Sequence, residues 1–209
     1  MREHLPIYRC AAVVLLLLGV TLAGSAGAED LSIRNCTWCH GTSAQGYTPA
    51  PRLAGQRAAY IAGQLRKFRA RDRNAPLDKQ YMWAAAQHLG DERIHALAVY
   101  FSELSPHAAK DGDPAIVARG KEIYQNGLPS ENIVACVACH GPDAQGVGRI
   151  PQLGGLAYSY LKRRLEQWNE GYSVSGAVPM PHIAGQLSPD KIDALASYLS
   201  FVRYARASD

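Results

Sequence analysis

The 209-residue chain has little excess charge, few cysteines and no long apolar run beyond its N-terminus. With 22 basic and 18 acidic residues, it lacks the strong basic surplus of a dedicated nucleic-acid binder. Its five cysteines make a thin disulfide framework for a chain of this size. A composition of 47% hydrophobic residues with interspersed charge excludes a disordered chain. One large core is compatible with this length, and so are two domains of about 90 residues each.

The apolar run that the chain does have lies at residues 11–23, and its surroundings are typical of an export signal. Arg2 and Arg9 precede the run, and an Ala-Gly-Ala cleavage sequence follows it. This layout predicts a signal peptide over residues 1–28 and export to the periplasm. The run is too short to favour a membrane span, although an uncleaved anchor stays open as the alternative. Cys10 precedes the run, which argues against a lipoprotein.

The rest of the chain repeats itself, with an offset of 100 residues that later becomes 98. The string C-x-x-C-H-G occurs at residues 36–41 and again at residues 136–141. A P-x-L-x-G string, one methionine and an A-L-A-x-Y-hydrophobic string then follow in the same order in both halves. Such ordered self-similarity predicts a tandem duplication. We expect a first domain at residues 29–105, a linker at residues 106–112 and a second domain at residues 113–209.

In an exported protein, C-x-x-C-H is typical of a covalent haem attachment site. Two thiols can add across the two vinyl groups of one haem to form thioethers, and the adjacent imidazole is then held under the iron as an axial ligand. The two-residue gap lets one helical turn place all three side chains on one side of the ring. We therefore expect two covalently bound haem c groups. The residues concerned are Cys36, Cys39 and His40 in the first repeat and Cys136, Cys139 and His140 in the second.

Two other uses of these four cysteines stay open at this point. A single zinc ion could be coordinated by all four thiolates, with neither motif histidine as a ligand. A thioredoxin-like redox pair would need a strand–helix–strand setting, which the sequence around neither motif provides. The duplicated motif and the export signal together favour haem attachment over both.

Methionine is scarce, and its placement suggests a second axial ligand for each haem. Apart from Met1, the chain contains only Met82 and Met180, at equivalent places in the two repeats. A methionine more often fills a gap in a core, but a matched pair favours sulfur ligands opposite each histidine. His182 is a rival ligand, which could serve only the second repeat. The other histidines of the mature chain are expected at the surface.

The pattern of apolar residues is helical in five segments, and no convincing alternating strand is present. In the last segment, Ser188 is a predicted N-cap and Pro189 the first helical residue. Side chains alone would give each domain a small core, which a covalently held macrocycle would enlarge. The predicted helices cover residues 57–71, 91–104, 113–126 and 158–170, with the fifth beginning at residues 188–190.

These motifs resemble those of the class I cytochromes c, specifically the tandem two-haem cytochrome c4 type, over essentially the whole mature chain. The resemblance implies an all-α fold of two tandem class I cytochrome c domains, each wrapped around one covalent haem. It implies thioether cysteines, proximal histidines and distal methionines at the positions given above. It also implies that Pro51 and Pro151 accept hydrogen bonds from the proximal imidazoles. Gly120 and Tyr124 resemble the family's first-helix residues, which cross the last helix near Tyr198.

The first repeat departs from the family pattern. Only residues 29–35 precede Cys36 in the mature chain, so the first helix is expected to be very short or absent. Tyr100, the counterpart of Tyr198, would then lack its usual crossing partner. This departure concerns the stability and exposure of the first haem, not its ligation.

The predicted function is one-electron transfer and not enzyme catalysis, because iron bound by both histidine and methionine has no open position. The resemblance implies transient encounters with a membrane quinol:cytochrome c reductase and with a terminal oxidase or another periplasmic acceptor. Peripheral association with the membrane is compatible with this role, and no nucleic-acid partner is expected. Two alternatives stay open: a haem enzyme with a labile distal ligand, and an electron-transfer subunit of a periplasmic dehydrogenase or peroxidase complex.

Charge is distributed unevenly between the repeats. Residues 29–105 contain 10 basic and 7 acidic groups, whereas residues 106–209 contain 10 of each. The densest basic run, at residues 66–73, could steer an acidic partner towards the first domain. Such a run is more often the solvated face of a helix, which is the interpretation favoured here.

Overall fold

A computed structural model describes residues 26–172 and 179–203 of the chain. The predicted signal peptide, apart from its last three residues, lies outside the described residues. The chain divides into two units, Met1–Asn35 and Cys36–Asp209, and both cytochrome-like repeats from their first cysteine onward belong to the second unit. Within the described part, no helix combines the length and the apolar character that a membrane crossing needs.

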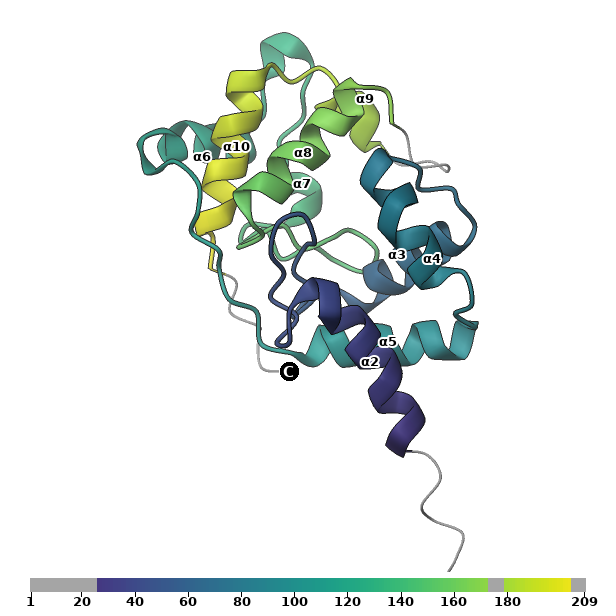
Figure 1. The fold of residues 1–209 in the computed structure, drawn as a ribbon. Helices are drawn as coiled ribbons and strands as arrows, with labels where there is room; N and C mark the ends of the chain where they lie inside the picture. Colours follow the sequence, from purple (N-terminus) through teal and green to yellow (C-terminus); the bar gives the residue numbers. More distant parts are fainter. Residues whose placement is uncertain (1–25, 173–178, 204–209) are drawn as a thin grey trace, which may run out of the picture. The chain divides into compact units, whose positions relative to one another are not determined.

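The described residues are helices joined by turns and loops (Figure 1), and their only strand-like pairings are isolated bridges. The prediction of an all-α fold is confirmed. In the first repeat the elements are α2 (Ala26–His40), α3 (Ala58–Arg69), the π-helical turn η2 (Asp78–Met82), α4 (Trp83–Ala86) and α5 (Asp91–Glu103). In the second they are η3 (Pro114–Ile116), α6 (Val117–Asn126), η4 (Pro129–Glu131), α7 (Val137–His140), α8 (Tyr158–Asn169), α9 (Met180–Ala184) and α10 (Pro189–Phe201).

The predicted helices are present with bounds close to those expected, but two termini differ in detail. The helix expected from residue 113 opens with the 3₁₀ turn η3, where the Asp113 carboxylate accepts from the backbone N–H of Ala115 at 2.9 Å. Ser188 does occupy the N-cap of α10, yet its side chain makes no capping bond. Its hydroxyl donates instead to the Asp190 carboxylate at 2.5 Å. The nearby carboxylate competes with the backbone for that hydroxyl.

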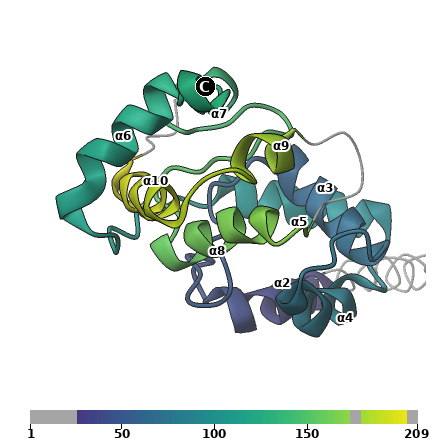
Figure 2. The same cartoon turned by 90° about the horizontal axis from the view of Figure 1, so that it is seen from above.

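The core of the second domain forms where α6 and α8 pack against α10 (Figures 1 and 2). Gly120 of α6 lies against α10, and the Tyr124 ring packs on Tyr198 with centroids 5.5 Å apart. This is the helix crossing that the family resemblance implied. The buried apolar residues of this core include Ile123, Leu161, Leu187, Ile192, Leu195 and Leu199.

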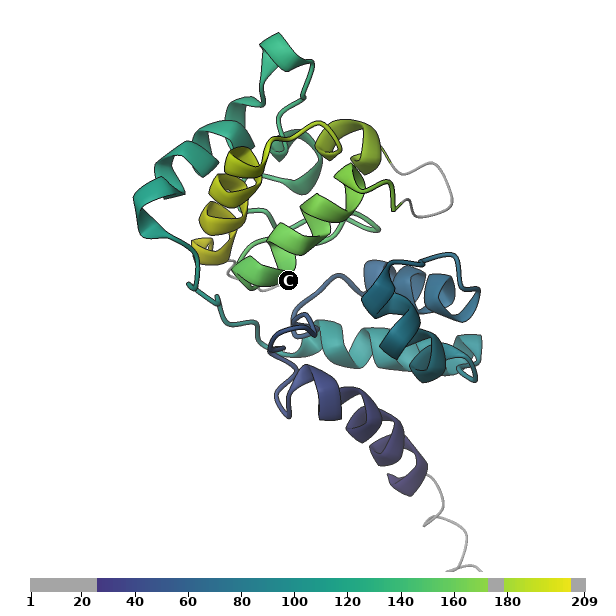
Figure 3. The same cartoon turned by 45° about the horizontal axis from the view of Figure 1, so that its top comes forward.

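In the first domain, α3 packs against α4 and α5 (Figure 3). Helix α2 begins at Ala26 and continues through the first C-x-x-C-H motif to His40, so the expected short first helix is not a separate element. Neither glycine nor proline occurs between residues 28 and 40 to end it, whereas Gly127 and Pro129 end the helix that precedes the second motif. Tyr100 exposes 38% of its surface, which agrees with the expected lack of a crossing helix.

The segment between the repeats is held by hydrogen bonds to both of them. The backbone N–H of His107 donates to the Gln45 side chain at 2.9 Å. The backbone N–H of Ala109 donates to the Gly155 carbonyl at 3.1 Å, and that of Lys110 to the Ser200 carbonyl at 3.0 Å. The linker is therefore a structured connection whose polar groups find partners in the two repeats.

Candidate functional site

Each motif histidine is buried and hydrogen-bonds through Nδ1 to the proline carbonyl that the family resemblance indicated. Nδ1 of His40 lies 2.7 Å from the Pro51 carbonyl oxygen, and Nδ1 of His140 lies 3.0 Å from that of Pro151. A carbonyl can only accept, so each Nδ1 carries the proton and donates. The tautomer fixed in this way leaves Nε2 unprotonated, which is the state in which imidazole binds a metal.

Burial also keeps both rings neutral. It lowers the pKa of His40 and of His140, and the hydrogen bond to the proline carbonyl offsets that effect only in part. A neutral imidazole is the form that ligates iron, because the imidazolium has no free lone pair.

The four motif cysteines are unpaired thiols placed one turn or less from these histidines. Burial is the main reason that the pKa of Cys36 and of Cys136 rises to about 11, so both are protonated at neutral pH. Cys39 and Cys139 are exposed. Among the described residues, no group of three or more histidine, cysteine or acidic side chains is arranged to hold a metal ion. The zinc alternative therefore finds no support, because the two cysteine pairs do not form a common site.

The two methionines lie at matched places in the repeats, Met82 in the helical turn after α3 and Met180 in the short helix after α8. Met82 is the last residue of the π-helical turn η2, and Met180 is the first residue of α9. Both are half-buried, and Met180 packs against the core of the second domain. His182, the rival ligand, is exposed. The placement favours the methionines as the candidate distal ligands.

Buried charged and polar side chains test whether the site fits a haem, whose propionates are anionic. Arg73 donates to the Asp78 carboxylate at 3.0 Å and to Gln64 at 2.9 Å, with both members of the ion pair nearly inaccessible. Arg164 stacks over the Trp168 ring at 5.2 Å, and burial and the charge of Arg73 lower its pKa. The indole N–H of Trp168 is buried and has no partner among the described residues. An orphaned donor beside a cation fits a carboxylate of a bound group, so the residues present fit haem.

Comparison with known proteins agrees with this geometry. The sequence profile of the cytochrome c family matches residues 25–105 and 117–202. The chain belongs to the cytochrome c family. It is 31% identical to cytochrome c4 of Pseudomonas aeruginosa over 197 residues, which cover 89% of this chain and 94% of that protein. It is 34% identical over 209 residues to a protein of Stutzerimonas stutzeri named thiosulfate dehydrogenase electron acceptor, covering 95% of each chain.

A solved structure gives the same result at the level of the fold. Cytochrome c4 of Acidithiobacillus ferrooxidans superposes with a TM-score of 0.74 at 35% identity, covering 79% of this chain and 98% of that one. The protein is thus a di-domain cytochrome c of the c4 type. Its two C-x-x-C-H motifs and two His/Met pairs indicate two covalent haem c groups, and its function is electron transfer.

The basic run at residues 66–73 of this cytochrome c does not form one solvated face. Arg66 and Arg69 both pair with Asp91 at the surface, at 3.0 and 3.1 Å. Arg73, in contrast, is buried in its ion pair with Asp78. The solvated-face interpretation therefore applies to the start of the run and is wrong for its last residue.

Sequence reasoning missed a polar contact between the repeats that involves Arg52 and Gln56, both only 5% exposed. A signal was available in the repeat itself. Arg52 corresponds to the uncharged Gln152, and the polar Gln56 corresponds to the apolar Leu156, so two positions of a similar loop differ in charge or polarity. Such differences inside a duplicated segment mark places where the two halves have different surroundings.

Proposed function

We propose that this cytochrome c is a periplasmic one-electron carrier that shuttles between a membrane reductase and a terminal oxidase or another periplasmic acceptor. The single observation that carries the proposal is the pair of buried imidazoles, each oriented by a proline carbonyl and each matched by a half-buried methionine. An iron bound by both the histidine and the methionine would have no open position for a substrate and would exchange electrons and not atoms.

In the proposed assignment, the cysteines of each motif form the two thioethers that fasten a haem. His40 and His140 supply the proximal nitrogen, and Met82 and Met180 the distal sulfur. When bound, each haem supplies a one-electron Fe(III)/Fe(II) couple. The protein's contribution is to fix the tautomer of each histidine through Pro51 and Pro151, to exclude water and to set the potential by burial and hydrogen bonding.

One relative suggests a specific electron donor. Because the Stutzerimonas stutzeri protein is named a thiosulfate dehydrogenase electron acceptor, a thiosulfate dehydrogenase is a donor worth testing alongside quinol:cytochrome c reductase. Stopped-flow reduction of the ferric protein by each purified enzyme would compare the two. A donor that reduces it no faster than it reduces a mitochondrial-type cytochrome c would be eliminated.

Exposed aromatic side chains near the first motif support docking of a partner at the first domain. Trp38, between the two motif cysteines, is 84% exposed, and Tyr47, which is 53% exposed, donates from its hydroxyl to the Trp38 carbonyl at 2.7 Å. The matching residues of the second repeat are Ala138 and Val147. Exposed aromatic residues are frequent at protein interfaces, and electron-transfer encounters are small and short-lived.

A redox titration with optical spectra tests the carrier function. Protein made in a host that matures c-type cytochromes should contain two haems, both low-spin in the ferric state, with a Met–iron charge-transfer band. Neither haem should react with cyanide or peroxide on the timescale of turnover. A high-spin fraction that turns over peroxide would instead establish the enzyme alternative, and material without haem would refute the proposal.

A further inference from the structure

The two repeats contact each other through the same loop, the one that carries the histidine-orienting proline. Arg52 and Gln152 occupy equivalent positions, each directly after that proline. Arg52 donates through Nη1 to the Gly155 carbonyl and through Nη2 to the Gly154 carbonyl, both at 2.8 Å. In the amide orientation that pairs donors with acceptors, Gln152 Nε2 donates to the Gly55 carbonyl at 2.7 Å, and its Oε1 accepts from Arg52 at 3.1 Å. The contact is nearly symmetric.

Gln56 adds hydrogen bonds to this contact that have no equivalent on the other side. Its Nε2 donates to the backbone carbonyl of Gln152 at 2.9 Å, and its Oε1 accepts from the backbone N–H of Gln152 at 2.8 Å. The N–H of Gln152 belongs to the same peptide group as the carbonyl of Pro151, which accepts from Nδ1 of His140. A hydrogen-bonded chain therefore runs from a side chain of the first domain, through one peptide group, to the proximal imidazole of the second.

Among the described residues, the second domain gives the first no such bond, because the residue that corresponds to Gln56 is Leu156. Leucine has no polar group with which to bond the peptide group between Pro51 and Arg52. Each imidazole thus donates to the carbonyl of an equivalent proline. The two sites differ in the N–H of that peptide group, which is bonded by a glutamine side chain only in the second domain.

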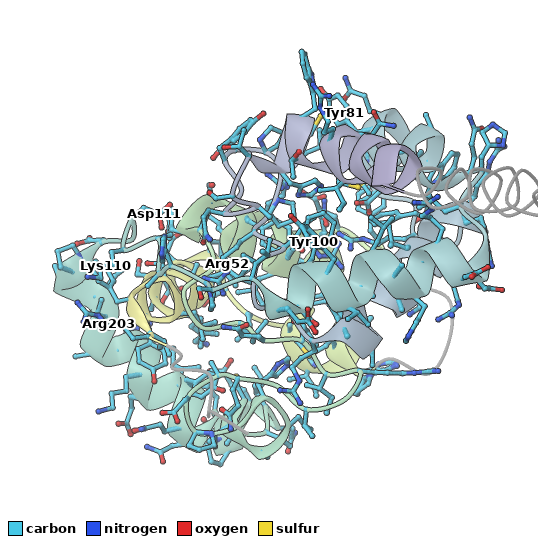
Figure 4. The ribbon with its side chains drawn as sticks, turned by 90° about the horizontal axis from the view of Figure 1, so that it is seen from below. Arg52, Tyr81, Tyr100, Lys110, Asp111 and Arg203 are labelled. Atoms are coloured by element: carbon cyan, nitrogen blue, oxygen red, sulfur yellow. The ribbon has the colours of Figure 1, made fainter. Side chains whose placement is uncertain are left out.

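The side chains that make this chain of hydrogen bonds are buried. Gln152 is fully buried, and Arg52 and Gln56 expose only 5% of their surface. Arg52 lies in the interior, whereas Lys110 and Arg203 are exposed (Figure 4). Burial lowers the pKa of Arg52 to about 10, so its guanidinium stays charged at neutral pH and keeps its bonds to the carbonyl groups. Hydrogen bonds in series strengthen one another where water is excluded.

We propose that Gln56 of the first domain is a positioning residue for His140 of the second, acting through the peptide group between Pro151 and Gln152. This rests on the proposed role of His140 as the proximal ligand. By accepting from that peptide N–H, Gln56 makes the Pro151 carbonyl a stronger acceptor, so the imidazole becomes a stronger electron donor. A more basic ligand stabilises ferric iron, and the potential of the second haem is lowered relative to the first.

The deciding variant is Gln56→Leu, which gives the first repeat the residue of the second. It should raise the reduction potential of the second haem and leave that of the first unchanged. It should also speed solvent exchange of the His140 Nδ1 proton in the ferrous protein, because the Pro151 carbonyl that accepts from this proton becomes a weaker acceptor. NMR signals of the two methionine methyl groups, followed through a redox titration, report each haem separately.

Gln45→Leu is the matched control, because Gln45 makes three hydrogen bonds, as Gln56 does, but none of those of Gln45 is to Gln152. Gln45 donates to the Ser43 carbonyl at 3.3 Å and to the Ser105 carbonyl at 2.9 Å, and it accepts from the His107 N–H at 2.9 Å. It should leave both potentials unchanged. Gln56→Glu retains an acceptor oxygen and should keep the second potential at or below its original value. It also provides a folded test should the leucine variant fail to fold.

Equal shifts of both haems in Gln56→Leu, no shift, or the same shift in Gln45→Leu would overturn the inference. So would a Gln56→Glu protein whose second potential rises as in the leucine variant. The unsubstituted protein tests the ligand assignment separately, since two methionine methyl signals shifted by the haems must be present before any variant is compared.

Discussion

Gly120 of α6 lies against the backbone carbonyl oxygen of Ala194 in α10. A Cβ at Gly120 would overlap that oxygen and would approach Cβ of Tyr198 at 2.7 Å. The two helices can therefore cross at this distance only because the residue has no side chain. The crossing carries the Tyr124–Tyr198 contact, and the Tyr124 hydroxyl donates to the Gly141 carbonyl, one residue beyond His140. The packing of α6 on α10 therefore positions Tyr124, which in turn bonds the end of the second C-x-x-C-H-G motif.

Gly120→Ala should destabilise the second domain by about 3 kcal/mol, because the methyl group forces two packed backbones apart. The matched control is Gly63→Ala in α3, where a Cβ would meet nothing within 4 Å. That variant should gain about 0.5–1 kcal/mol from helix propensity. Denaturant unfolding of the haem-loaded protein, followed by circular dichroism, measures both. Similar values for the two variants would contradict the close approach seen at Gly120.

Met82→Ala and Met180→Ala should each abolish one half of the Met–iron charge-transfer absorbance of the ferric protein. Loss of the thioether also removes a ligand that favours ferrous iron, so the affected haem should have a lower potential. The measurement is the near-infrared spectrum per haem, with haem content determined independently. If either variant keeps the full band, that methionine is a packing residue.

Asp78→Asn should cost about 3 kcal/mol of unfolding free energy, because it leaves the buried Arg73 without its counterion. Asp91→Asn is the control, since Asp91 pairs with Arg66 and Arg69 at the surface, and its loss should change stability little. Both substitutions remove a carboxylate that pairs with arginine. The difference between their effects on the free energy of unfolding therefore measures the effect of burial. Urea midpoints at constant salt give that difference.

Stability of the second domain should fall in acid partly through Asp193. Its hydrogen bond from Lys162 is the main reason that the pKa of Asp193 lies below the ordinary value of 3.8. A carboxylate with a depressed folded-state pKa contributes stability above its unfolded pKa and loses it as the pH falls through the folded value. Because both side chains are one-third exposed, the contribution is at most about 1 kcal/mol. Asp193→Asn should flatten the stability profile below pH 3.8, measured by urea titrations, and an unchanged slope would refute this.

Much of the fold could be predicted from local patterns. The helical spacing around Ile61 and Phe68 identified α3, and Pro189 marked the start of α10. The repeat located both haem motifs and both methionines, because the chemistry of covalent attachment needs fixed residue types at fixed spacing. The hydrogen bonds from the histidines to Pro51 and Pro151 followed from the family resemblance, and the structure contains them.

Contacts between distant segments were not predictable in this way. The bond between Gln56 and Gln152 joins residues 96 positions apart, and no local pattern specifies which polar groups two loops exchange when they meet. The ion pair of Arg73 was misread as part of a solvated run, because charge patterning reports sequence and not burial. Likewise Ser188 has the residue type of a cap, but Asp190 two residues later takes its hydroxyl.

The near-symmetric exchange between Arg52 and Gln152 also limits how far this architecture can grow. Each copy of the repeat offers one loop, and pairing uses up both loops, as in any isologous dimer. A third repeat fused to the chain would find both of these loops already paired, so it could not join the first two through the same contact. This contact therefore favours a closed pair of repeats over a longer array.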